Sequence, residues 1–180
     1  VIQSEMFSDA IIETEKLYAF GNKVISPPYH LIFKAFKMCP LDKFKCVIVG
    51  GEPYPDGKSA TGLAFGVDSN RISALPDSSQ NIMNEIEASH PMQLVMDFDI
   101  SLESWARQGV LLISANLTIE AHKSKTHTHI WHPVMTAILD HITAKFPYHP
   151  TIVFGELANT VISPYTKQYA QVLYLSLIHI

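Results

Sequence analysis

Four short apolar runs along the chain predict the strands of one sheet. They occupy residues 45–49, 110–113, 151–154 and 170–174. The first run ends at two glycines, and the second ends at Ser114. Runs of this length with few polar residues are typical of strands that are buried on both faces of a parallel sheet. We therefore expect four strands and a mainly parallel sheet.

Two segments between these runs have the spacing of amphipathic helices. Ile82 and Ile86 lie one turn apart in residues 79–88, and apolar residues recur every four positions across residues 133–145. Pro133 suits the first turn of the second segment, where the missing N–H of proline has no helical partner to lose. We predict a helix over each segment.

A third helical pattern covers residues 9–23, before the corner formed by Ser26-Pro27-Pro28. The prolines of this corner cannot continue a helix. Helices that alternate with strands are typical of a layered α/β fold.

The composition is that of one soluble globular domain. The chain has 180 residues, and the 47% that are hydrophobic can form one substantial core. No apolar run approaches the roughly 18 residues of a membrane span. Cys39 and Cys46 are too few for a disulfide framework, which indicates a reducing, cytoplasmic compartment.

The two ends of the chain look unlike natural termini. Val1 is not an initiator methionine, and no signal-peptide pattern follows it. Residues 175–180, LSLIHI, resemble the translation of a sequencing adapter. We therefore expect a single domain over residues 1–174 and a non-native tail over residues 175–180.

A net charge of −4 argues against a broad basic face that holds nucleic acid by counterion release. Any contact with DNA is then local, through amides and hydroxyls at a few phosphates. This argues against a high-affinity coating protein more than against an enzyme.

The most informative stretch follows the first predicted strand and reads Gly50-Gly51-Glu52-Pro53-Tyr54-Pro55. It places an acid and an aromatic residue just beyond the carboxyl end of a strand, where open α/β sheets bind their ligands. By itself the stretch is also compatible with a tight glycine turn and a solvated Glu52. The flanking motifs decide between these interpretations.

Five motifs follow one another in order between about Pro27 and Ala158. The first consists of Pro27-Pro28, F-K-A-F at 33–36 and V-I-V-G-G-E-P-Y at 47–54. The next three are G-L-A-F-G-V at 62–67, P-D-S-S-Q-N-I at 76–82 and W-A-R-Q-G-V-L-L-I-S-A-N-L-T at 105–118. The last consists of A-H at 121–122, T-H at 126–127 and Trp131. This series resembles the family 1 uracil-DNA glycosylases. The resemblance implies a three-layer α/β sandwich, in which helices flank a central, mainly parallel four-stranded sheet.

The resemblance also implies a function, which is the hydrolysis of the N-glycosidic bond of a flipped-out uracil in DNA repair. The implied partner is uracil-containing DNA, with no membrane and no cofactor. A monomer in the cytoplasm is expected, or in the host cytoplasm or nucleus if the source is viral.

The roles of the site residues are carried over position by position. Glu52 stands at the family's catalytic Asp, which stabilises the cationic sugar and orients the attacking water. Gly51, where the family has Gln, supplies a backbone amide to the base. Tyr54 excludes the methyl group of thymine, and Phe65 stacks on the base. Ser114 replaces the family's Asn, which pairs with the uracil edge.

Several of these positions leave alternatives open. Glu52 is one methylene longer than Asp, and Pro55 stands where the family has His. The hydroxyl of Ser114 reaches less far than an amide, and Asn116 would face the same way if the strand continued. Asn116 is then either a substitute reader of the base or an ordinary loop residue. For the two aromatic residues, the alternative is core packing.

Ser78 and Ser79 follow Asp77 at the start of a predicted helix. Such residues cap a helix, and the exposed amides of a helix start also bind phosphate. We expect Ser78, Ser79 and His127 to contact DNA phosphates. We expect no metal site, since no cysteine accompanies the histidines and their spacing is not that of a zinc helix.

The family's closing motif, H-P-S-P-L, should follow Tyr174, where the expected tail begins. Loss of such an electrostatic donor lowers rates roughly a hundred- to thousandfold, so impaired activity is expected. The changes at Gly51, Glu52, Pro55 and Ser114 leave two alternatives open. One is a non-catalytic DNA-binding or polymerase-accessory protein that retains the glycosylase fold, and the other is a glycosylase with a shifted base preference.

Overall fold

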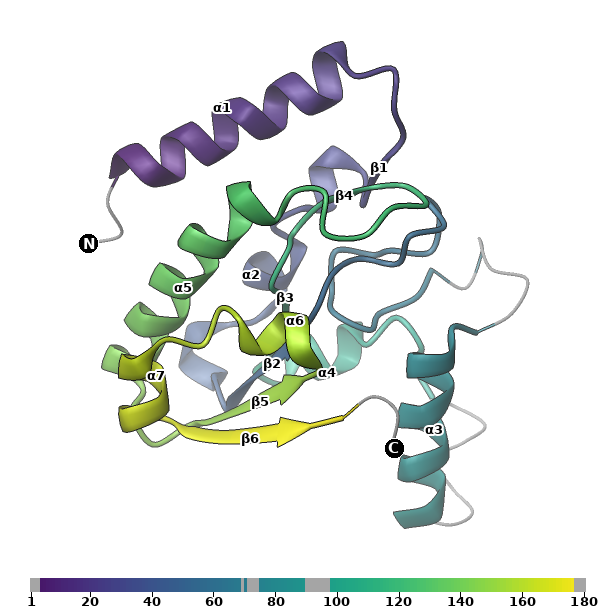
Figure 1. Ribbon diagram of the computed structural model, residues 1–180. Coiled ribbons are helices and arrows are strands. Elements are labelled where there is room, and N and C mark those ends of the chain that lie inside the picture. Colours follow the sequence, from purple (N-terminus) through teal and green to yellow (C-terminus); the bar gives the residue numbers. More distant parts are fainter. Residues whose placement is uncertain (1–3, 69, 71–74, 90–97, 177–180) are drawn as a thin grey trace.

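A sheet of four parallel strands forms the centre of the protein (Figure 1). The computed structural model describes residues 4–68, 70, 75–89 and 98–176. The strands are β2 (Cys46–Gly50), β3 (Val110–Ser114), β5 (Pro150–Phe154) and β6 (Gln171–Leu175), in the spatial order β3-β2-β5-β6. All three neighbouring pairs are parallel, which confirms the predicted sheet.

Seven helices and a small second sheet surround these strands within the described part of the chain. The helices are α1 (Ser4–Phe20), α2 (Lys34–Met38), α3 (Asp77–Ser89), α4 (Glu103–Arg107), α5 (Thr128–Lys145), α6 (Glu156–Asn159) and α7 (Pro164–Tyr169). The second sheet pairs β1 (Ile25–Ser26) with β4 (Ile119–Glu120). Single 3₁₀ turns lie at Tyr29–Leu31 and Leu41–Lys43.

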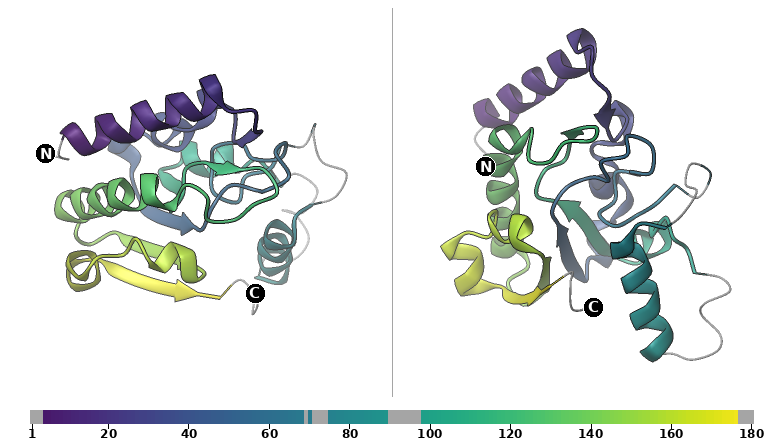
Figure 2. Two further views of the ribbon diagram at one scale, coloured as in Figure 1. Left: turned by 45° about the horizontal axis from the view of Figure 1, so that its top comes forward. Right: turned by 45° about the vertical axis from the view of Figure 1, so that its right-hand side comes forward.

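The helices lie on both faces of the sheet. The connection from β2 to β3 carries α3 and α4, and the connection from β3 back past β2 to β5 carries α5. Because parallel connections are right-handed and these two run in opposite directions, they cross opposite faces. Helix α1 packs on α5, and α3 lies on the far side of the molecule from α1 (Figure 2). This arrangement is the expected three-layer sandwich.

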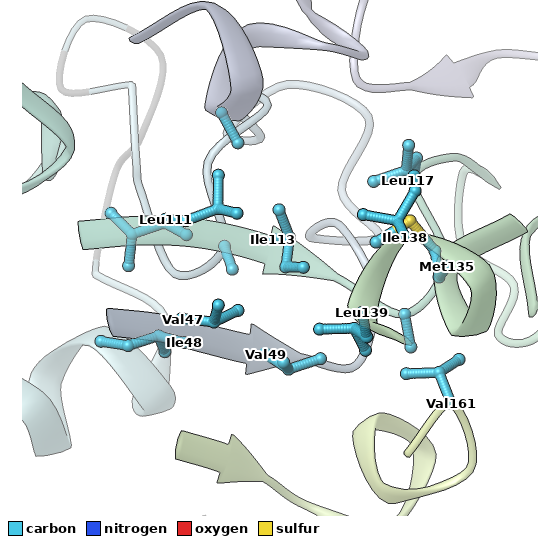
Figure 3. Packing of buried hydrophobic residues seen from close by; sticks show 14 of the residues in the cluster. Val47, Ile48, Val49, Leu111, Ile113, Leu117, Met135, Ile138, Leu139 and Val161 are labelled. Atoms are coloured by element: carbon cyan, nitrogen blue, oxygen red, sulfur yellow. The ribbon is translucent and has the colours of Figure 1, made fainter. Parts of the chain in front are cut away.

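The core joins α5 to the central strands. Val47 and Val49 of β2 and Trp131, Met135 and Leu139 of α5 are almost completely buried. Figure 3 shows Leu139 close to the end of β2. Because the strands are buried on both faces, they carry the continuous apolar runs from which they were predicted.

The predicted start of α5 was wrong. The helix begins at Thr128, so Pro133 lies in its interior rather than in its first turn. The proline leaves the carbonyl of His129 without its helical N–H partner. Burial of Ile130 and Trp131 stabilises the earlier turn, because both side chains join the core. Tertiary packing thus extends the helix beyond the local signal.

Two expectations concern the ends and the membrane. Strand β6 includes Leu175, and residues 177–180 of the expected tail lie outside the described residues. In the ranges that the structure describes, no helix combines the length and the apolar character needed to cross a bilayer.

Candidate functional site

The candidate site lies where the two central strands end. Gly50 and Ser114 are partners in the last register position of β2 and β3. Beyond the sheet, the Ala115 amide donates to the Gly50 carbonyl at 2.8 Å, and the Asn116 amide donates to Gly51 at 3.0 Å. These bonds hold the two loops side by side, which brings residues that are about 60 positions apart in sequence into one place.

Four of the predicted site residues line one pocket at this edge. They are Glu52, Tyr54, Phe65 and Ser114, with Ala64 and Leu117 among the apolar neighbours. The pocket has a volume of about 20 Å³. A cavity of this size holds about one water molecule, so it is closed to a pyrimidine ring in this conformation.

Gly51 lies beside the pocket and does not line it. A side chain at this position would meet Leu157 of α6 at 3.5 Å, which is ordinary van der Waals contact. The backbone therefore approaches no neighbour so closely that it requires glycine. The role of its amide toward the base stays a prediction.

The carboxylate of Glu52 is held by three donors. Its Oε1 accepts from the Ser124 hydroxyl at 2.6 Å. Its Oε2 accepts from the Lys125 amide at 3.0 Å and from the Asn116 side-chain amide at 3.4 Å. Ser124 and Lys125 belong to the loop between β4 and α5, more than 70 residues away in sequence. Sequence reasoning missed these two residues, because nothing local relates them to Glu52.

Asn116 is completely buried and faces Glu52. Its Nδ2 also donates to the Thr128 hydroxyl at 3.0 Å, at the start of α5. Its Oδ1 is buried without a hydrogen-bond partner among the described residues. An acceptor left in this way costs about 1–3 kcal/mol. Ser114 lines the pocket, whereas Asn116 does not.

Tyr54 connects the pocket to the first turn of α3. Its hydroxyl lies 2.6 Å from Ser79 Oγ and 3.0 Å from Ser78 Oγ. Ser79 also donates to the Phe65 carbonyl at 3.0 Å. Burial raises the pKa of Tyr54, so the ring stays neutral at physiological pH. Ser79 is buried and Ser78 is half-buried, and their contact with phosphate stays a prediction.

Phe65 has an unusual backbone conformation for a residue with a side chain. Its φ is 63°, in the left-handed region that non-glycine residues rarely enter. The ring packs edge-on against Phe154 with centroids 5.2 Å apart. It also lies 3.2 Å from the place that a Cβ on Gly50 would occupy. The absence of a side chain at Gly50 therefore lets this ring lie over the end of β2.

His127 is buried behind the site rather than in the pocket. Its Nδ1 lies 2.9 Å from the Thr118 hydroxyl, which accepts a bond from Trp131 Nε1 at 2.7 Å. Burial lowers the pKa of His127. The contact of His127 with a phosphate stays a prediction. His127 directly precedes α5, whereas Ser78 and Ser79 lie in α3.

The other histidines form no metal centre in the described ranges. No group of three or more His, Cys, Asp or Glu side chains there could hold an ion. His129 instead pairs with Glu13 at 3.0 Å, and His132 lies 3.3 Å from the Thr160 hydroxyl.

Several known proteins that resemble this chain are uracil-DNA glycosylases. The chain is 39% identical over 135 residues to a uracil-DNA glycosylase of Azobacteroides pseudotrichonymphae, which covers 75% of the chain and 59% of that protein. The uracil-DNA glycosylase of Streptococcus mutans is 39% identical over 144 residues, covering 79% and 63%. That of Borreliella burgdorferi is 36% identical over 157 residues, covering 87% and 69%. No family model matches.

Solved structures support the same fold. The mimivirus uracil-DNA glycosylase superposes with a TM-score of 0.73 at 21% identity, over 96% of this chain and 68% of that one. The enzyme from Nitratifractor salsuginis superposes with a TM-score of 0.68 at 18% identity, over 97% and 82%. The chain spans less than two thirds of the first two relatives, at 59% and 63% of their lengths.

Proposed function

The chain belongs to the uracil-DNA glycosylase family, and we propose from this that it hydrolyses the bond between a flipped-out uracil and its deoxyribose in DNA. The product is an abasic site, and the process served is base excision repair. One observation carries the proposal for this chain. Glu52, Tyr54, Phe65 and Ser114, which stand at the family's motif positions, line a single pocket at the tips of two parallel strands.

The proposed chemistry needs one acid and no cofactor. Cleavage leaves positive charge on the sugar and negative charge on the base, after the nucleotide has left the stack. The carboxylate of Glu52 stabilises the developing cation and orients the attacking water. Its longer side chain shifts this oxygen relative to an aspartate, and the three donors around it determine where it lies.

The remaining pocket residues select the base. The Phe65 ring stacks on the uracil, and Tyr54 occupies the space that the methyl group of thymine would need. The Ser114 hydroxyl contacts the base edge and can donate and accept, but over a shorter reach than an amide. We propose that this serine weakens discrimination between uracil and cytosine.

Base entry requires the pocket to open, because its volume of about 20 Å³ is too small for a pyrimidine. The network of Tyr54, Phe65 and Ser79 holds the pocket wall to the first turn of α3. We propose that a DNA phosphate bound at this turn, through Ser78 and Ser79, draws on the same hydroxyls. Binding of the backbone and opening of the pocket are then coupled.

The remaining features of the proposal concern organisation. Residues 1–174 belong to a single domain, whose strand β6 runs to Leu175. The protein acts as a monomer on uracil-containing DNA, away from membranes, in the cytoplasm or in the host cytoplasm or nucleus if it is viral. Gel filtration of the purified chain tests the oligomeric state directly.

A second candidate function is favoured by the closed pocket. A non-catalytic DNA-binding or polymerase-accessory protein would retain the fold without needing space for a base. In that case the donors around Glu52 serve only to fix the loop between β4 and α5.

A single-turnover assay separates the two functions. The chain, in large excess, is incubated with a labelled oligonucleotide that contains one uracil, and abasic sites are then cleaved with alkali. Strand breaks at the uracil support the glycosylase. Binding without breaks favours the accessory protein, and breaks at another base indicate a shifted base preference. An oligonucleotide with thymine at the same position is the control.

A further inference from the structure

The carboxylate of Glu52 lies in a cradle that two other segments of the chain build around it. We define the cradle as Asn116, Ser124 and the backbone amide of Lys125. We propose that Asn116 and Ser124 are positioning residues that hold the longer acid where the family uses an aspartate. This inference rests on the proposed function, since it assigns the cradle to that reaction.

The arrangement of donors leaves one part of the carboxylate available. A carboxylate accepts about four hydrogen bonds, roughly two at each oxygen. Oε2 receives two donors, from Lys125 and Asn116, whereas Oε1 receives one, from Ser124. The remaining position on Oε1 is therefore the place for the attacking water, and the Ser124 hydroxyl determines the orientation of this oxygen.

The burial of Asn116 supports a role for its amide. An apolar side chain of the same size would bury no acceptor of its own, but it would give no donor to Glu52 or Thr128. Asn116 instead buries Oδ1 without a partner, while both described bonds of the side chain come from Nδ2 and reach Glu52 and Thr128. The advantage of asparagine at this position thus lies in the groups to which Nδ2 donates.

The loop that supplies Ser124 is fixed at both sides. The His122 amide donates to the Pro55 carbonyl at 2.6 Å, which ties the loop to the segment after Glu52. The Glu120 amide donates to the Thr126 hydroxyl at 2.9 Å. Lys125 has a φ of 59°, in the left-handed region, which turns its amide toward Glu52. These bonds and the turn at Lys125 hold the loop, and with it the Ser124 hydroxyl, in place beside Glu52.

A double-mutant cycle tests the cradle through the rate of the chemical step. Ser124→Ala should lower the maximal single-turnover rate about tenfold, with little change in the protein concentration that gives half the maximal rate. Ser124→Thr keeps the hydroxyl and should stay within about twofold of the wild type. In a Glu52→Asp background, Ser124→Ala should change the rate less than about twofold, because the shorter acid no longer reaches residue 124. Equal effects in both backgrounds would overturn the proposal.

Asn116→Leu provides the second test of the same idea. It should also lower the maximal rate about tenfold, measured well below the melting temperature of the variant, because it removes a donor to Glu52. A normal rate in this variant would show that the Asn116 amide has no part in positioning.

A measurement that does not depend on activity follows the Lys125 amide by NMR. Glu52→Ala should shift its proton resonance and accelerate its exchange with solvent about tenfold or more, because the accepting oxygen is lost. If the wild-type chain releases no uracil, the proposed function fails. The resonance of the Lys125 amide still shows whether this amide donates to Glu52. A shift then supports the cradle, and an unchanged resonance overturns it.

Discussion

Two hollows at opposite ends of the sheet differ in almost every respect. The one at the carboxyl ends of the strands is the candidate site, with a volume of about 20 Å³ and the side chains of Glu52 and Ser114 in its wall. The other lies near the amino ends, between α1, α2 and α5, and has a volume of about 400 Å³. It is lined by Phe7, Phe33, Phe36, Phe44, Phe146 and other residues, most of them apolar.

The comparison teaches that size alone does not locate the chemistry. The side chains that line the large hollow are mostly apolar, and its two titratable residues, Cys39 and His141, have no acid beside them in the lining. The small hollow brings an acid, a phenol and a hydroxyl together, and hydrogen bonds from distant segments fix these groups. Reactivity follows the convergence of polar groups at the strand ends.

Glu52→Gln should lower the single-turnover rate of uracil excision about a thousandfold, since it removes the charge that stabilises the sugar cation and keeps the length of the side chain. The rate is measured with excess protein, and the melting temperature serves as the control for folding. Retention of more than a tenth of the activity would mean that the small hollow is not the catalytic site.

Phe44→Ala should lower the free energy of unfolding by about 3 to 4 kcal/mol, because it removes a buried ring that packs on Phe146 at 4.6 Å. Excision measured well below the melting temperature should change less than about twofold. Urea denaturation gives the stability. A large loss of activity in fully folded protein would assign a catalytic function to the large hollow instead.

Ser114→Asn should raise the rate of uracil excision about tenfold, because an amide donates and accepts at the base edge over a longer reach. Release of cytosine from a matched oligonucleotide should not rise. Unchanged excision of uracil would contradict the placement of residue 114 in the base pocket.

The two hollows should also differ in their response to pH. Burial lowers the pKa of His127, behind the small hollow, from an ordinary value of 6.5, whereas burial raises that of Cys39, in the wall of the large one. Because the pKa of His127 is lower in the fold than in the unfolded chain, the unfolded chain binds more protons as the pH falls through about 6.5, so stability falls as the pH drops. Protonation of Cys39 does not change over this range.

The measurement is urea denaturation of the wild type and His127→Gln at pH 7.5 and 5.5. The loss of stability between these two values should be smaller in the variant than in the wild type, because glutamine does not titrate. An identical loss in both proteins would mean that His127 does not titrate differently in the folded and unfolded states.

Strand positions and the main motif could be predicted because both depend on local order in the sequence. A strand that is buried on both faces needs consecutive apolar residues, and residues 46–50 and 110–114 supply them. The acid and the aromatic ring follow the first of these strands directly. Parallel pairing then places them beside Ser114 without further information.

The start of α5 could not be predicted in this way. Local periodicity and Pro133 indicated a late start, but the burial of Ile130 and Trp131 stabilises an earlier turn. Packing against the sheet overrides a proline, because a buried tryptophan contributes more than one lost hydrogen bond.

By itself, the sequence determined the order of elements, the family and the end of the sheet at which the polar residues meet, since these depend on which residues are neighbours along the chain. Only the tertiary structure decided that Glu52 is held by Asn116, Ser124 and Lys125, and that the pocket around it is nearly closed. The partners of a carboxylate depend on loops that approach from 64 to 73 residues away, and their positions follow from the packing of the whole fold.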